Sequence, residues 1–143
     1  MLTVLCGIPG SGKTTMSEQI AAEQNAVLYC FDKRQGAFSP TKAPSVRQQM
    51  YAEIAEDLRS GKPVVCDDVN VYKAYRKNIL NAVSGIDCRK VLIVMTTPFD
   101  ECLRRNANRK FRLPDALIHS INGAYEPPAL EEGWDEIVFV TTE

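Results

Sequence analysis

The chain has 143 residues, of which 45% are hydrophobic and 24% are charged, a balance that is ordinary for one soluble globular domain. Its 17 basic and 18 acidic residues give a net charge of −1, which excludes a strong overall positive field drawing it to nucleic acid or membranes. No stretch approaches the roughly 18 consecutive apolar residues of a membrane-spanning helix, and the first residues lack the basic start of a signal peptide. We therefore expect a single domain over residues 1–143 and no association with a membrane.

The cysteines point to a reducing environment. There are five of them, an odd number, and none stands in a C-x-x-C pair, which argues against a disulfide framework or a zinc site. Cys6, Cys30 and Cys66 lie in or beside apolar runs, where a reduced cysteine packs like a small hydrophobic residue. We expect a cytoplasmic protein.

The first motif that carries chemistry follows a predicted strand over residues 2–6. Residues 7–15 read Gly-Ile-Pro-Gly-Ser-Gly-Lys-Thr-Thr and match the phosphate-binding loop G-x-x-x-x-G-K-[ST]. In this loop backbone N–H groups surround the β-phosphate, Lys13 reaches the β and γ oxygens, and the Thr14 hydroxyl binds Mg²⁺. The predicted nucleotide contacts are Gly7, Pro9, Gly10, Ser11, Gly12, Lys13, Thr14 and Thr15. A helix predicted over 13–24 directs its positive end at the same anion, so the sequence predicts a nucleoside triphosphate site.

Strand and helix patterns alternate along the rest of the chain. Further strands are predicted at 27–31, 63–67, 89–95 and 136–141, and further helices at 45–60, 73–83, 99–107 and 114–123. Strands that are apolar throughout are typical of a parallel sheet covered on both faces. The pattern predicts an α/β fold with a single doubly wound, mainly parallel five-stranded sheet flanked by helices. Ligands of such sheets bind beyond the carboxyl ends of the strands, so functional residues should follow each strand.

Carboxylates follow the second and third predicted strands. Asp32 would face the γ-phosphate held by Lys13, where it could accept the proton of an attacking hydroxyl, although a helix-capping aspartate is the alternative. Asp67 and Asp68 follow the third strand, in the pattern of a carboxylate that orients Mg²⁺ or its water shell. The sequence does not decide which of these two aspartates serves the metal, and the other one could cap the next helix.

A basic cluster late in the chain predicts a short lid over about 104–113. Five of the nine residues from Arg104 to Arg112 are basic. Arginine forks suit phosphate oxygens, so such a lid could close on the triphosphate and stabilise charge in the transition state. Arg109 is the first candidate for that role and Arg105 the second, while a solvated helix end is the alternative.

A group of aromatic and basic residues at 72–77 fits either a substrate-facing patch or an exposed amphipathic helix.

Together these motifs resemble the small P-loop kinases related to the kinase domain of phage polynucleotide 5′-kinase/phosphatase, a group that includes zeta-toxin-like kinases and AAA-domain ATP-binding proteins. The resemblance rests on the loop at 7–15, on Asp32, on Asp68-Val69-Asn70, on Leu103-Arg104-Arg105-Asn106 with Arg109, and on the stretch 127–136. It implies that Asp32 is the general base, that Lys13 and Arg109 grip the phosphates, and that Thr14 holds Mg²⁺. It also implies that Asp68 and Asn70 orient the acceptor or the metal shell.

The resemblance implies the function as well. Many relatives carry an acceptor-binding arginine three positions after the aspartate, where this chain has Gln35, so Arg34 is the candidate here. We expect an ATP- and Mg²⁺-dependent kinase whose first candidate acceptor is the 5′-OH of a polynucleotide, followed by a nucleoside or another small molecule. The absence of an Asn-Lys-x-Asp sequence argues against guanine recognition. Two other classes stay open, namely an ATPase or nucleotide-binding switch and a non-catalytic interaction module.

Overall fold

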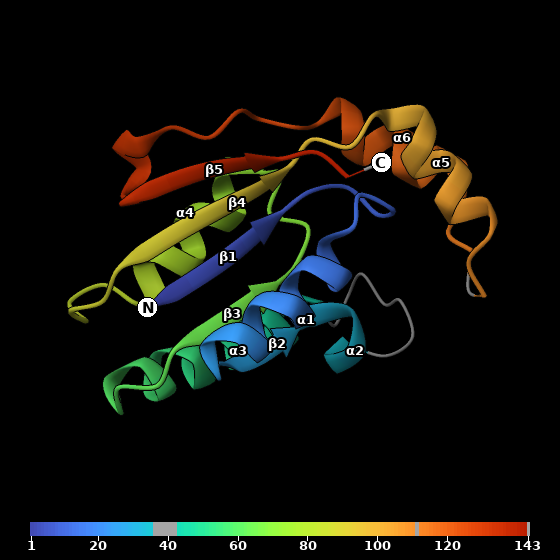
Figure 1. The fold of residues 1–143 in the computed structure, drawn as a ribbon. Helices are drawn as coiled ribbons and strands as arrows, with labels where there is room; N and C mark the ends of the chain where they lie inside the picture. The colour runs from blue at the N-terminus through green and yellow to red at the C-terminus, as the bar shows by residue number, and fades with distance from the viewer. Residues whose placement is uncertain (36–42, 111, 143) are drawn as a thin grey trace.

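Five parallel strands form the central sheet in the computed structural model, which describes residues 1–35, 43–110 and 112–142 (Figure 1). The strands are β1 (Leu2–Cys6), β2 (Val27–Cys30), β3 (Val64–Asp67), β4 (Lys90–Met95) and β5 (Glu136–Val140). Their order across the sheet is β2-β3-β1-β4-β5, and every neighbouring pair is parallel. The predicted five-stranded doubly wound sheet is confirmed, and each predicted strand ends within one residue of the observed bounds.

The five predicted helices are also present. They are α1 (Lys13–Gln24), α3 (Ala43–Arg59), α4 (Lys73–Ala82), α5 (Phe99–Ala107) and α6 (Asp115–Gly123). Two short elements were not predicted, α2 (Phe31–Gln35) and the 3-10 turn η1 (Leu130–Glu132). The sequence assigned Phe31 to the second strand because it extends an apolar run. The ladder with β3 ends at the pair Cys30 and Asp67, so the chain is free to coil into α2 directly after it.

Alternating strand residues divide the core into two layers. Leu5 of β1 and Val65 of β3 pack with Ile20 of α1 on one face of the sheet. Their neighbours along the strands join the larger cluster on the other face, which includes Ile54 of α3 and Ile79 of α4. Figure 1 shows α1 in front of the sheet and α4 behind it. Both faces of the inner strands are therefore covered, which explains why these strands are apolar throughout.

Because the strands are parallel, the residues that follow them lie at one edge of the sheet. The carboxyl ends of β1, β2 and β3 lead into the loop at 7–12, into α2 and into the turn at 67–70. The paired register of Leu5 with Asp67 and of Cys30 with Asp67 brings these three strand ends side by side. This is the edge at which a doubly wound sheet binds its ligands.

A buried arginine on α4 holds the segment that leads into β5. Arg76 on α4 is fully buried, and its Nε and Nη2 donate to the Glu132 carboxylate at 2.9 and 3.0 Å. Its remaining hydrogen bonds go to the backbone oxygens of Asn70 (3.0 Å) and Glu126 (2.9 Å). Trp134 Nε1 donates to Glu132 as well, at 3.0 Å. Arg76 therefore belongs neither to a substrate-facing patch nor to an exposed helix face, which corrects its place in both interpretations. Lys73 and Lys77 are exposed, as the amphipathic-helix alternative expected.

Within residues 1–35, 43–110 and 112–142, no helix is both long enough and apolar enough to cross a bilayer.

Replacing Arg76 by Met should lower the free energy of unfolding by about 3–5 kcal/mol, because the change leaves the Glu132 carboxylate without its cation and three backbone or side-chain acceptors without a donor. Urea unfolding followed by circular dichroism measures this change. Lys77→Met is the control, since Lys77 is the exposed neighbour on the same helix and should cost less than about 0.5 kcal/mol. Equal stability of the two variants would contradict the role assigned to Arg76.

Candidate nucleotide and acceptor site

The phosphate-binding loop has the geometry that its glycines predict. Gly10 and Gly12 have φ values of 85° and 95°, in the left-handed region that favours glycine. A Cβ atom at Gly10 would lie 2.5 Å from the Cys102 carbonyl oxygen of α5, so the loop also needs glycine for close packing. Lys13 opens α1, and its Nζ donates to the Ile8 carbonyl within the loop at 3.4 Å. The loop, the lysine and the helix terminus are thus held together as an anion-binding unit.

A cleft of about 690 Å³ lies over this loop. It is lined by Pro9, Gly10, Gly12, Lys13, Thr14, Thr15, Met16, Gln19, Asp32, Arg105, Arg109 and Thr142. The structure therefore brings the three predicted catalytic residues, Lys13, Asp32 and Arg109, to one cavity. Met16, Gln19 and Thr142 were not predicted. Met16 and Gln19 follow the loop on α1, so helical periodicity could have found them, whereas only the tertiary fold brings in Thr142.

Asp67 is the carboxylate that faces the loop. Thr14 Oγ1 donates to Asp67 Oδ2 at 3.1 Å, and Ser17 Oγ donates to the same oxygen at 3.2 Å. Asp67 is the last residue of β3, whereas Asp68 follows in the turn and is directed elsewhere. Of the two aspartates that the sequence left open for the metal, Asp67 therefore lies beside Thr14, whereas Asp68 pairs with another residue.

Asp68 is held by an arginine that the sequence did not single out. Arg47 on α3 donates from Nε and Nη2 to the two Asp68 oxygens at 2.6 and 2.9 Å, and the side chains are only 14% and 3% exposed. Its guanidinium lies 3.7 Å from the Phe31 ring centroid and 4.5 Å from that of Tyr75. Burial lowers the pKa of Arg47, but hydrogen bonding and charge from Asp68 outweigh this and raise it. Arg47 and Asp68 thus form an ion pair whose guanidinium lies against two aromatic rings.

Asp32 is the third carboxylate near the loop, and the charges of both Asp67 and Asp68 act on it. It lies on α2, lines the cleft, and among the described residues forms no hydrogen bond or ion pair. Removal of water around the carboxylate raises its pKa, and the nearby charge of Lys13 opposes that rise. Asp68 and Asp67 raise the pKa further, while Arg109 lowers it. An unpaired carboxylate with a raised pKa, facing a phosphate-binding lysine, is suited to accept a proton.

Two predicted acceptor residues do not line the cleft. Arg34 Nη2 donates to Glu53 Oε2 of α3 at 2.5 Å, and its guanidinium lies 5.6 Å from the Tyr29 ring centroid. Asn70 is fully buried with φ 48°, and its Nδ2 donates to the Leu5 carbonyl at 2.9 Å. In the described structure Arg34 ties α2 to α3, and Asn70 holds the turn after β3.

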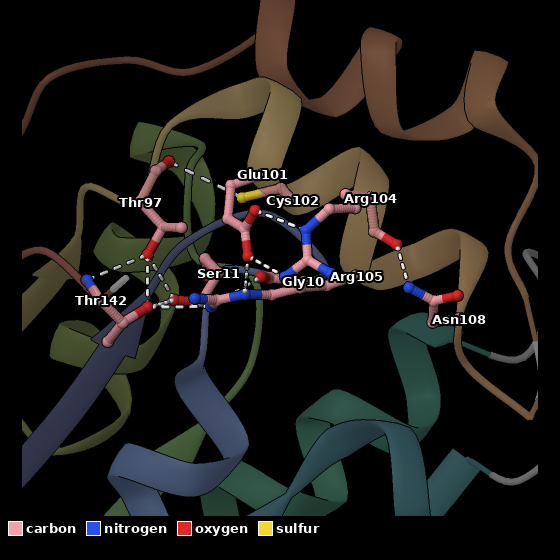
Figure 2. A network of polar contacts seen from close by, with 9 residues as sticks. All are labelled: Gly10, Ser11, Thr97, Glu101, Cys102, Arg104, Arg105, Asn108 and Thr142. Carbon is pink, nitrogen blue, oxygen red and sulfur yellow. Dashed lines mark hydrogen bonds and ion pairs between the residues drawn. The ribbon is translucent and has the colours of Figure 1, made fainter.

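The first arginines of the predicted lid belong to α5. Arg104 pairs with Glu101 on the outer side of the helix, and the two arginines hold the pKa of Glu101 down at about 2. Arg105 donates from Nε to Glu101 at 3.0 Å and from Nη1 to Gly10 O at 3.3 Å and Thr142 Oγ1 at 2.9 Å (Figure 2). Arg105 is therefore anchored to the rim of the loop.

Arg109 lies beyond the end of α5, is exposed and lines the cleft. The end of the connection that follows it is held to α5, because Asn106 Nδ2 donates to Leu113 O at 2.8 Å and Leu113 N donates to Asn106 Oδ1 at 3.0 Å. Residue 111 of the predicted lid lies outside the described residues, as does the segment 36–42 after α2. The lid predicted at 104–113 thus consists of the last turn of α5 and its connection to α6.

Comparisons with known proteins identify relatives of the whole chain. The profile of the family described as "Chromatin associated protein KTI12" matches residues 1–143. The L-seryl-tRNA(Sec) kinase of Methanococcus maripaludis is 28% identical, over 100% of this chain and 60% of the relative. Protein kti12 of Schizosaccharomyces pombe is 24% identical, over 96% of this chain and 56% of the relative. The chain thus spans less than two thirds of the length of these curated relatives.

Solved structures share the fold. Kti12 of Chaetomium thermophilum in complex with ADP-AlF3 superposes with a TM-score of 0.77 at 16% identity, covering 99% of this chain and 89% of that one. A chain of the Pnkp1/Rnl/Hen1 RNA repair complex superposes with a TM-score of 0.75 at 21% identity, covering 86% and 43%. These structures share the α/β architecture with a five-stranded parallel sheet that the sequence predicted.

Replacing Arg47 by Met should lower the free energy of unfolding by about 3 kcal/mol or more, since it strands the buried Asp68 carboxylate. Adding Asp68→Asn should recover part of this loss, because a neutral amide is cheaper to bury than an unpaired charge. Chemical denaturation of the two single variants and the double variant measures the coupling. Arg59→Met on the same helix is the control, because Arg59 is 58% exposed and pairs only with exposed Glu56. Purely additive losses would contradict the ion pair.

Proposed function

The chain belongs to the KTI12 family, and we propose that it is an ATP- and Mg²⁺-dependent phosphotransferase whose acceptor is a hydroxyl carried by RNA. The observation that carries this proposal is the unpaired Asp32 carboxylate in the same cleft as the phosphate-binding loop and Lys13. A nucleotide site alone does not require a carboxylate at that position, whereas phosphoryl transfer to a hydroxyl uses one as the proton acceptor.

The loop and the arginines would bind the triphosphate. Backbone N–H groups of the loop and the positive end of α1 suit the β-phosphate, and Lys13 balances charge on the β and γ oxygens. Among the described residues the Arg109 side chain has no hydrogen-bond or ion-pair partner and lines the cleft, where it can approach the γ-phosphate, while Arg105 is fixed against the loop. Arg109 is accordingly our candidate for stabilising transition-state charge.

The oxygen donors beside the loop suit Mg²⁺. Thr14 Oγ1 and Asp67 Oδ2 lie 3.1 Å apart, a hard-oxygen pair next to the phosphate-binding lysine. Among the described residues no group of three or more His, Cys, Asp or Glu could hold a metal, so the ion would arrive with the nucleotide and keep several waters. Thr14 would bind it directly and Asp67 through water. Bound there, Mg²⁺ supplies charge neutralisation and orientation of the transferred phosphoryl group.

Asp32 would complete the reaction from the opposite side. Its carboxylate accepts the proton of the acceptor hydroxyl as that oxygen attacks the γ-phosphorus in line with the leaving ADP oxygen. The neighbouring Asp68 carboxylate is neutralised by Arg47, which keeps a second bare charge away from the attacking oxygen. Catalysis then rests on positioning and electrostatics rather than on a covalent intermediate.

Support for an RNA-borne acceptor comes from the relatives. One curated relative is named as a kinase of seryl-tRNA(Sec), and a fold neighbour is part of an RNA repair complex. The 5′-OH of a polynucleotide is our first candidate, and a seryl hydroxyl on tRNA is the second. Nucleosides and other small hydroxyl compounds remain candidates of the same chemistry.

A second candidate function is an ATPase or nucleotide-driven switch. Two observations favour it, namely membership in the KTI12 family and the placement of Arg34 and Asn70 away from the cleft, which leaves few described residues to grip an acceptor. A kinase and an ATPase differ in one measurable respect, which is whether an acceptor becomes labelled.

With γ-labelled ATP and Mg²⁺, the wild type should label one member of a panel of 5′-OH RNA and DNA oligomers, seryl-tRNA and nucleosides. Asp32→Asn should reduce transfer by about 10²–10⁴-fold while ADP affinity stays within about twofold, because the amide is nearly isosteric but cannot take a proton. Lys13→Ala should weaken binding as well as transfer. Asp87→Asn, in an exposed loop at the other end of the sheet, is the control. Release of free phosphate that no acceptor changes would favour the ATPase or switch.

The raised pKa of Asp32 makes a separate prediction. Because the base works only when deprotonated, transfer should be lost as pH falls through this raised pKa, at a pH above the usual titration range of aspartate. Lys13→Met should move the Asp32 pKa further upward, since Lys13 lowers it. Carboxyl ¹³C NMR titration measures both shifts, with Asp32→Asn assigning the signal. An Asp32 that titrates within the usual range of aspartate in both proteins would refute the prediction.

A further inference from the structure

The ends of β4 and β5 carry two adjacent pairs of threonines. Thr96 and Thr97 follow β4, and Thr141 and Thr142 follow β5. The Oγ1 atoms of Thr96 and Thr141 lie 2.6 Å apart, and those of Thr97 and Thr142 lie 2.7 Å apart. The same hydroxyl contact is thus made twice, one residue apart along the two strands.

Only the second pair reaches the phosphate-binding loop. Thr97 Oγ1 donates to the Ser11 carbonyl at 2.8 Å, and Thr142 Oγ1 lies within donating distance of the same oxygen at 3.2 Å (Figure 2). Thr96 Oγ1 donates only to Val140 O, at 3.2 Å, outside the loop. Thr97 is buried at 8% exposure, whereas Thr96 is exposed. Two chemically matched pairs therefore differ in whether they touch the loop.

Holding the Ser11 carbonyl determines where the next N–H points. All described peptide bonds are trans, so the C=O of Ser11 and the N–H of Gly12 lie on opposite sides of one rigid plane. With the carbonyl tethered toward the strand ends, the Gly12 N–H is directed to the cleft side. Among the described residues it donates to no backbone or side-chain acceptor. A Cβ on Gly12 would lie 3.1 Å from Thr142 Oγ1, which shows how closely the pair packs on this peptide.

The Thr142 hydroxyl also contacts α5, the helix whose last turn begins the predicted lid. Arg105 on α5 donates from Nη1 to Thr142 Oγ1 at 2.9 Å and to the Gly10 carbonyl at 3.3 Å. The Gly10 carbonyl therefore accepts a hydrogen bond from Arg105 of α5, and the Ser11 carbonyl accepts one from Thr97 at the end of β4. Figure 2 shows Thr97, Thr142 and Arg105 converging on this side of the loop.

We propose that Thr97 and Thr142 are positioning residues for nucleotide binding, which aim the Gly12 N–H at the phosphate and connect the loop through Arg105 to the lid helix. This inference rests on the proposed function only in assuming that the loop binds a nucleotide. It adds residues that lie 86 and 131 positions from Ser11 in sequence.

Isothermal titration with ADP and Mg²⁺ tests the inference. Thr97→Val removes the hydroxyl at nearly constant shape and should weaken affinity about 3- to 10-fold, the range expected for one hydrogen bond. Thr97→Ser keeps the hydroxyl and should bind within twofold of wild type, as should the matched control Thr96→Val. In ¹H–¹⁵N spectra of the free proteins, the Gly12 amide should shift in Thr97→Val and stay in place in Thr96→Val.

The outcomes separate the inference from the proposed function. If the wild type does not bind ADP, the proposed function fails and the inference falls with it. If the wild type binds and Thr97→Val matches Thr96→Val in affinity and in the Gly12 signal, only the inference is overturned. Should Thr97→Val fail to fold in thermal denaturation, Thr142→Val against Thr142→Ser makes the same comparison at the partner hydroxyl, and equal affinities there overturn it.

Discussion

The parallel pairing of β1 with both β3 and β4 is the constraint on which the site depends. It sets Leu5 beside Asp67 on one side and beside Ile93 on the other, so three strand ends open at one edge. The phosphate-binding loop leaves β1 at that edge and is flanked by groups at the ends of the two neighbouring strands, Asp67 as the last residue of β3 and Thr97 after β4. Both contacts depend on register, because a slip by one residue would send each side chain to the opposite face.

At this edge of the sheet, neighbouring carboxylates differ in role because they have different hydrogen-bond partners. Asp67 receives hydrogen bonds from Thr14 and Ser17 of α1, whereas Asp68 is held from the other side by Arg47 of α3. Asp32 receives none and stays open to the cleft. Removal of water raises the pKa of Asp32, and the charges of Asp68 and Asp67 raise it further against the opposing charges of Lys13 and Arg109.

Four arginines likewise differ in role according to their burial and their partners. Arg76 is fully buried and fastens the turn after β3 to the segment before β5, while Arg47 is sandwiched between two rings at the acceptor side. Arg105 braces the loop rim, and Arg109 alone of these four is exposed. Guanidinium groups serve all four places because their planar forks satisfy carboxylates and carbonyls with fixed geometry. In our proposal, Arg109 is therefore the arginine that approaches the γ-phosphate when the nucleotide binds.

The sequence by itself determined the fold class, the strand and helix positions, the phosphate-binding loop and the carboxylates at the strand ends, because these follow from local periodicity and from contiguous motifs. It did not determine α2, the separate roles of Asp67 and Asp68, or the placement of Arg34 and Asn70. Only the tertiary structure decided those, and only it revealed Arg47, Thr97 and Thr142 as neighbours of the site. Their contacts join residues up to 131 positions apart. Such contacts depend on register and side-chain direction across the sheet, which no local pattern in the chain encodes.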